Sequence, residues 1–208
     1  MKTKIQTEKE LVFREWKKLY YSCSNLHHVN DVKFPAEVNF CLGKKVEHVK
    51  EDNYREVFEK LFNDNNFSIL MMDGGIISLF YEFEQNGDVC SHCLHYFPNI
   101  LIESEEDDMY NLFSDYENKN ILSKYVRIDF GKIGFQEHYH SACHIHFSLN
   151  KDGVRIPCNS WVSPMEFYMF IMTYIYHAPV DIDKTSKRKV LTENELLKCY
   201  LKFGGSDK

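Results

Sequence analysis

Four of the ten histidines in this sequence fall within nine residues, from His138 to His146. The last two, His144 and His146, occupy alternate positions in residues 143–149, where an apolar residue at every second position predicts a strand. Alternation then turns Cys143 toward the core and places both histidines on the opposite face of the sheet. Imidazole groups gathered on one face could transfer protons near neutral pH or bind a divalent metal.

Charged side chains from two other predicted strands are expected on the same face. In residues 125–130 the alternating apolar positions leave Arg127 and Asp129 opposite the core, and in residues 154–158 they leave Arg155 there. If the three strands are neighbours, these groups lie beside the histidines, and the preceding loop brings in a further imidazole. The candidate site residues are Arg127, Asp129, His140, His144, His146 and Arg155.

Three kinds of chemistry could use this cluster. A divalent metal could be bound by imidazole and carboxylate ligands. Metal-free cleavage of a phosphodiester would use one histidine as base and one as acid, with arginine stabilising the phosphorane charge. Alternatively, Arg127 and Arg155 could simply bind a phosphate or carboxylate with the histidines. A purely structural interpretation is a solvated strand face whose histidines hydrogen-bond to Asp129. The candidates for metal binding and for acid–base catalysis are the same: His140, His144, His146 and Asp129.

A second histidine-containing segment, residues 90–95, has the Cys-x-x-Cys spacing of a zinc half-site. A strand here would place Cys90 and Cys93 on opposite faces, where they could not bind one ion. No second Cys-x-x-Cys completes a four-ligand site. The Asn-Gly turn before this segment predicts a hairpin in which Ser78 pairs with His95. We therefore expect the histidines of this segment to be hairpin residues.

Length and composition restrict the class of protein. The 208 residues fit one domain, and 44% hydrophobic with 27% charged residues is typical of a globular chain and excludes a disordered one. A net charge of −6 excludes a generally basic nucleic-acid-binding surface but permits a local arginine and histidine pocket. Residues 1–10 lack the apolar core of a signal peptide, and the longest apolar stretch, 165–176, is shorter than the about 20 residues of a membrane span. We expect a cytoplasmic protein with reduced cysteines and no membrane partner.

Helix signals lie toward both ends of the chain, with strand signals between them. Thr7 with Glu10 forms a capping box, a second helix begins near Asn53, and the sequence from Ser163 to Glu166 opens an apolar helix that reaches about residue 176. Thr192 with Glu195 caps a last helix. The predicted strands are residues 67–72, 76–84, 89–97, 125–130, 142–149 and 154–158.

This order predicts a single α+β domain. Its sheet is mainly antiparallel, a meander of about five to seven strands, with helices from both termini packed on one face. A helical N-terminal part would cover residues 1–64, the sheet 65–160 and the C-terminal helices 161–208.

Several segments also resemble a known family in their order and spacing. They are Asp73-Gly74 with the apolar run to Tyr81-x-Phe83, His95-Tyr96-Phe97-Pro98, Arg127-x-Asp129, His140-x-x-x-His144-x-His146, Arg155-Ile156-Pro157 and Ser163-Pro164-x-x-Phe167. Over about residues 65–177 the chain resembles an uncharacterised bacterial family, domain-of-unknown-function family 2290. The family pattern has Pro where this chain has Ser141. The resemblance brings no established activity, and by analogy alone the pattern is similar to small bacterial toxins with a His-x-His strand.

Two functions from different classes stay open. The first is a phosphodiester-acting hydrolase or nuclease-like toxin or defence component, with nucleic acid or nucleotide as substrate and the arginines as phosphate clamps. The second is a non-catalytic subunit or regulator that binds a protein partner in a phage-defence or toxin–antitoxin type complex. A missing complete catalytic motif and 15% aromatic residues favour the second. A histidine-based sensor of pH or metal is a third hypothesis, but no bistable element in the sequence supports it.

Overall fold

Three helices and eight strands are described in a computed structural model, over residues 7–23, 28–29, 41–46, 49–50, 53–99, 124–131, 142–147, 149 and 155–178. The helices are α1 (Glu8–Cys23), α2 (Tyr54–Asn63) and α4 (Pro164–Tyr174). The strands are β1 (His28–Val29), β2 (Cys41–Leu42), β3 (Ile69–Leu70), β4 (Ile76–Phe83), β5 (Val89–Phe97), β6 (Val126–Gly131), β7 (Cys143–Phe147) and β8 (Arg155–Pro157).

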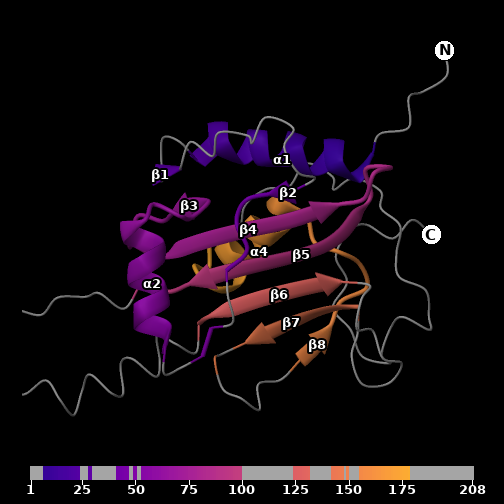
Figure 1. Cartoon of the computed structure of the whole chain (residues 1–208). Coiled ribbons are helices and arrows are strands. Elements are labelled where there is room, and N and C mark those ends of the chain that lie inside the picture. The colour runs from indigo at the N-terminus through magenta and orange to yellow at the C-terminus, as the bar shows by residue number, and fades with distance from the viewer. Residues whose placement is uncertain are drawn as a thin grey trace, which may run out of the picture.

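The strands join one antiparallel sheet in the order β1-β3-β4-β5-β6-β7-β8, and β2 pairs with β4 (Figure 1). β3 pairs with the start of β4 and β2 with its end, so the two short strands share the edge of β4 opposite β5. From β4 to β8 each strand pairs with the next one in the sequence. The predicted α+β fold with a meandering sheet is therefore confirmed, and Ser78 lies opposite His95 as predicted.

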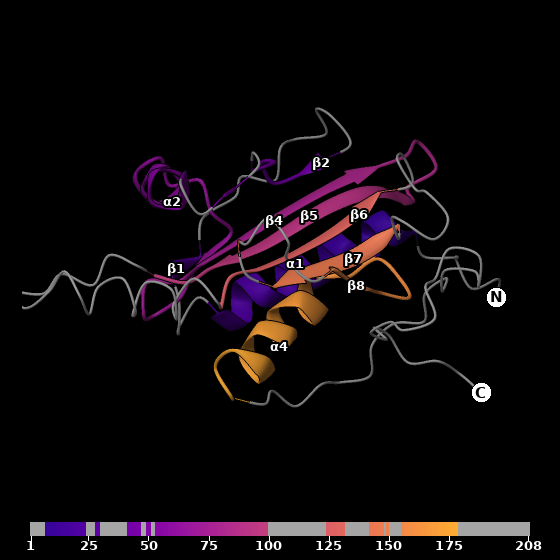
Figure 2. The same ribbon diagram turned by 90° about the horizontal axis from the view of Figure 1, so that it is seen from below.

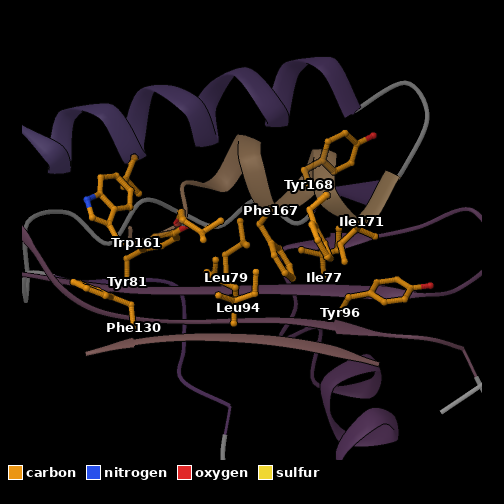
Figure 3. Packing of buried hydrophobic residues seen from close by; sticks show 14 of the residues in the cluster. Ile77, Leu79, Tyr81, Leu94, Tyr96, Phe130, Trp161, Phe167, Tyr168 and Ile171 are labelled. Carbon is orange, nitrogen blue, oxygen red and sulfur yellow. The ribbon is translucent and has the colours of Figure 1, made fainter. Parts of the chain in front are cut away.

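The main core lies between one face of the sheet and the two helices α1 and α4 (Figure 2). Because side chains alternate along a strand, every second residue of β4, β5 and β6 enters this core. Figure 3 shows Phe167 and Ile171 of α4 meeting the sheet side chains. Burial of each such side chain stabilises the fold by about 1.5–3 kcal/mol. The sheet residues labelled there are Ile77, Leu79, Tyr81, Leu94, Tyr96 and Phe130.

Both core helices begin at the capping boxes that the sequence predicts. The Thr7 hydroxyl accepts from the Glu10 N–H at 3.2 Å, and the Glu10 carboxylate accepts from the Thr7 N–H at 3.3 Å. At α4, Ser163 and Glu166 make the same reciprocal pair, with Pro164 at the first helical position. Glu166 is buried, so this cap also satisfies polar groups inside the core.

α2 lies on the other face of the sheet, unlike the two helices from the chain ends (Figure 2). Its buried residues are Tyr54, Phe58 and Leu61, whereas Phe62 is 43% exposed. Tyr54 packs on Phe97, and its hydroxyl donates to the Pro98 carbonyl at 2.7 Å. A second, smaller core therefore closes one end of the face that carries the polar residues.

Some expectations concern residues outside the described part of the chain. They are the placement of His140 and the helix expected from Thr192. Among the described helices, none combines the length and the apolarity needed to span a bilayer.

Candidate functional site

The register of β5 to β8 brings the predicted site residues into two adjacent rows. Asp129 of β6 lies between Cys93 of β5 and His144 of β7. Arg127 occupies the neighbouring row, between His95 and His146, and Arg155 of β8 lies opposite His146. The three strands are neighbours, as the sequence argument required, so these side chains share the face opposite the main core.

One oxygen of Asp129 is the centre of the cluster. Its Oδ2 lies 2.8 Å from Arg127 Nε, 3.4 Å from His146 Nε2 and 3.8 Å from His144 Nε2. The N–H of Arg127 Nε does not point along the first contact, so charge rather than a directed hydrogen bond holds that pair. The two histidine rings meet edge to face at 4.7 Å between centroids. Three predicted residues thus converge on the carboxylate of a fourth, Asp129.

The surroundings of Asp129 keep it ionised. Burial alone would raise its pKa, but the hydrogen bond from His146, the charge of Arg127 and the hydrogen bond from Cys93 together hold the pKa well below its usual range. Burial lowers the pKa of His146, and the nearby Arg127 adds to this, while Asp129 opposes it. Arg127 Nη2 also lies 3.1 Å from His146 Nε2, so the guanidinium contacts both members of this pair.

A hydrogen-bonded chain approaches Asp129 from its other side. Cys93 Sγ lies 3.1 Å from Asp129 Oδ1 and 2.9 Å from His95 Nε2. His95 Nδ1 lies 2.8 Å from the Tyr125 hydroxyl, and the His95 ring stacks on Phe97 at an interplanar angle of 7°. His95 is 1% exposed, so this chain of hydrogen bonds lies in the interior. It connects the cluster around Asp129 to the second, smaller core, which α2 covers.

The proton positions in this chain follow from its charges. Burial, followed by the charge of Asp129, raises the pKa of Cys93 well above its usual range, so the thiol keeps its single proton. That proton goes to the carboxylate, because a bond to a charged acceptor is the stronger one. Burial lowers the pKa of His95 to about 3, so its imidazole is neutral. His95 Nε2 then donates to the sulfur, and Nδ1 accepts from Tyr125.

A cavity of about 600 Å³ opens on this face of the sheet. Arg127, Asp129, His144 and Arg155 line it, whereas His146 is not among its lining residues. Arg155 is exposed, and the side chain of His144 is only 6% exposed. The cluster therefore divides into residues that face the cavity and residues, including His146, that hold Asp129 in place.

The expectation that Cys90 and Cys93 lie on opposite faces is wrong. The strand register shifts between Glu82 and Phe83, so Cys90 is an extra residue on β5, and both cysteines line the cavity. Burial and the charge of Glu82 raise the pKa of Cys90. The described cysteines are free thiols, and within the described chain the candidate metal ligands that gather do not include Cys90 or Cys93.

The candidate metal ligands in the described residues are Asp129, His144 and His146, whose ligand atoms all lie within 4.8 Å of one another. Two imidazoles and a carboxylate fit several divalent metals. Arg127, however, contacts both Asp129 Oδ2 and His146 Nε2, the atoms that such an ion would need. The donor set fits a metal, and a bound ion would have to displace the guanidinium. His140, the fourth predicted ligand, lies outside the described residues.

Sequence reasoning missed three residues of the site, which are Cys93, His95 and Tyr125. His95 is a hairpin residue, as predicted, and it also lies at the centre of the buried chain, which was not predicted. The correctly predicted β4–β5 register already placed it on the face of Ser78. Extending the register by one strand, to β6, would have placed Cys93 opposite Asp129. The strand register could therefore have identified Cys93 and His95 as site residues, whereas their residue types alone could not.

Comparison with known proteins gives a family but no activity. Residues 20–201 match the family described as "Uncharacterized conserved protein (DUF2290)", and the chain belongs to this family. No curated protein and no solved structure is significantly similar to the chain.

Proposed function

For this member of the DUF2290 family, we propose a hydrolase that cleaves a phosphodiester in the cavity above β5–β8 without a bound metal. The observation that carries the proposal is the Asp129 carboxylate, held by Arg127 and flanked by two histidines, on the wall of a cavity that Arg155 also lines. Anionic substrate groups need cations, and proton transfer needs a group such as imidazole.

His144 is the acid–base residue in this proposal, because its imidazole lines the cavity. It takes the proton of an attacking water or hydroxyl as the new bond to phosphorus forms. It then gives that proton to the oxygen of the leaving group as the old bond breaks. The Asp129 carboxylate, 3.8 Å from His144 Nε2, stabilises the imidazolium between these steps.

The two arginines have different roles. Arg127 is committed to Asp129 and His146, so its main contribution is to keep the carboxylate ionised and oriented. Arg155 is exposed at the cavity, and its guanidinium can bind two phosphoryl oxygens at once. We assign substrate binding to Arg155 and positioning to Arg127 and His146.

The test is hydrolysis of bis(p-nitrophenyl) phosphate and of short single-stranded oligonucleotides by purified protein treated with EDTA. His144→Gln should lower kcat/KM by about 10²–10⁴-fold, the usual contribution of acid–base catalysis. His177→Gln is the matched control, because His177 is exposed at the end of the described chain, beyond α4. Arg155→Ala should raise KM about tenfold, and Arg55→Ala, at an exposed position of α2, is its control.

Metal analysis separates this mechanism from the metal-dependent alternative. Wild-type protein that loses its activity in EDTA and regains it with one equivalent of a divalent metal would favour an ion on Asp129, His144 and His146. Equal activity before and after EDTA supports the proposal. An inactive wild-type protein under both conditions, on every diester tested, contradicts it.

The alternative function is binding of a protein partner. Its support is a set of large hydrophobic side chains that are exposed in the described residues, since such side chains are enriched at interfaces. They are Tyr21, Phe62, Met72 and Tyr174. Sedimentation of the wild type and of the variants Met72→Ser and Tyr174→Ser measures the size of any assembly. A smaller assembly in the variants would show that these side chains hold it together.

A further inference from the structure

The cavity extends well beyond the cluster around Asp129. Arg155 of β8 lines one side, and Phe80 and Glu82 of β4 line the other. Four strand spacings separate β4 from β8 in the sheet, which at about 4.8 Å each amounts to about 19 Å. The volume of about 600 Å³ is that of a site for a small organic molecule rather than for a phosphate ion alone. A ligand that fills the cavity therefore needs a second group near β4.

An aromatic ring faces the cavity at the β4 end. Phe80 is 7% exposed, and Lys45 Nζ lies over its ring at 6.0 Å from the centroid. The segment that carries Lys45 is fixed to β4 by Gly43, which has a φ of +76°. A Cβ at that position would lie 1.9 Å from the Leu79 carbonyl oxygen, so only glycine allows this contact. A ring on a cavity wall is a suitable platform for a nucleobase, which would stack there with the flexible Lys45 side chain moved aside.

A carboxylate lies beside this platform. Glu82 is two residues from Phe80 on β4, so both share the cavity face, and it accepts a hydrogen bond from the Ser91 hydroxyl. A carboxylate repels phosphate, which makes this end unsuitable for the phosphoryl group. It accepts hydrogen bonds from exocyclic amino groups, as carboxylates do from the N4 of cytosine.

We propose that Phe80, Glu82 and Lys45 form a base-recognition subsite for a nucleotide whose base carries an exocyclic amino group, namely adenine, cytosine or guanine. The base stacks on Phe80, its amino group donates to Glu82, and its phosphate reaches Arg155 and His144. The inference rests on the proposed function, because it names the substrate of the same cavity. Uracil and thymine offer carbonyl oxygens instead of an amino group and are rejected.

Calorimetric titration of the full chain with AMP, CMP, GMP and UMP tests the subsite. These monoesters are ligands and not diester substrates, so binding is measured apart from hydrolysis. The amino-bearing nucleotides should bind about tenfold more tightly than UMP. Glu82→Gln should remove most of this preference, whereas Glu56→Gln, at an exposed position of α2, should retain it. Phe80→Leu should weaken binding of all four nucleotides by about tenfold.

The outcomes separate the two proposals. Equal binding of UMP and AMP, or no nucleotide binding by a protein that still cleaves the diester, overturns the subsite and leaves the proposed hydrolase. Base-selective binding by a protein without diesterase activity supports the subsite and overturns the hydrolase. If Phe80→Leu fails to fold, the Glu82→Gln and Glu56→Gln pair still decides the question.

Discussion

The two buried histidines of β5 differ in their hydrogen-bond partners: His92, on the face under α1 and α4, bonds to the backbone, whereas His95, on the cavity face, bonds to side chains. His92 and His95 of β5 show the contrast, since both are at most 2% exposed. His92 Nε2 accepts from the Val162 N–H at 2.9 Å, and the Tyr81 hydroxyl donates to the Val162 carbonyl at 2.8 Å. His95 instead joins the side-chain network that reaches Asp129.

Because both histidines are almost equally buried, the exposed fraction of a histidine does not show whether its role is structural or functional. The His92 ring packs on Tyr81 and Phe130 and joins the segment before α4 to the sheet. The groups bonded to His95 are titratable side chains beside a cavity, where changes in protonation can be coupled to a ligand. The partners of a buried histidine are therefore more informative than its exposure.

The largest expected effect comes from pH and concerns His95. Its pKa is about 3 in the folded chain and about 6.5 when unfolded, so the unfolded state binds more protons between these values. Stability should then rise with pH from about 3 to 6.5, with a slope of about 1.4 kcal/mol per unit from this group. Urea unfolding at a series of pH values measures the slope, which should decrease in His95→Gln. The same slope in both proteins would show that His95 is not buried as a neutral group.

Breaking the ion pair on the cavity face should have the next largest effect. Arg127→Met leaves the Asp129 carboxylate without its closest charged partner, and we expect a loss of about 3 kcal/mol in the free energy of unfolding. Arg127→Met combined with Asp129→Asn should recover much of the loss, because the uncompensated charge is gone. Chemical denaturation of these two variants and of the exposed control Arg55→Met measures this. A double variant less stable than Arg127→Met would contradict the account.

On the helix-covered face, replacement of His92 should affect stability far more than activity. His92→Leu leaves the Val162 N–H without this acceptor, at an expected cost of about 2 kcal/mol. Diester hydrolysis per folded molecule should change little, since the His92 ring packs on Tyr81 and Phe130 of the main core, although His92 is also among the residues that line the cavity. Thermal unfolding and kcat/KM measured on the same preparation check both parts. Loss of activity without loss of stability would mean that the two faces do not divide as described.

The smallest effect is expected at Cys93. Cys93→Ser keeps an O–H donor toward Asp129 Oδ1, so it should reduce kcat by only a few fold, whereas Cys93→Ala removes the donor. The alanine variant should also shift the acid limb of the pH–rate profile upward, because the bond from Cys93 helps to hold the pKa of Asp129 low. Identical profiles for the two variants would show that Cys93 only fills space.

The strands and their faces were predictable because alternation is a local property of the chain. Arg127, Asp129 and His144 were placed on one face by this argument alone, and the structure has them there. The position of α2 was not predictable, because an amphipathic helix packs equally well on either face of a sheet. The face of the sheet on which Cys90 lies was predicted wrongly, because a β-bulge leaves no clear mark in the sequence.

Filling the cavity without touching the Asp129 network tests the central claim most directly. Gly131 lines the cavity opposite Ser91, and a Cβ there would meet nothing within 4 Å. We expect Gly131→Ala to hydrolyse bis(p-nitrophenyl) phosphate as the wild type does. Gly131→Leu should fold with the same stability but lose at least about 10²-fold in kcat/KM, because the substrate no longer reaches His144. A wild-type rate in a folded Gly131→Leu variant would place the chemistry outside this cavity.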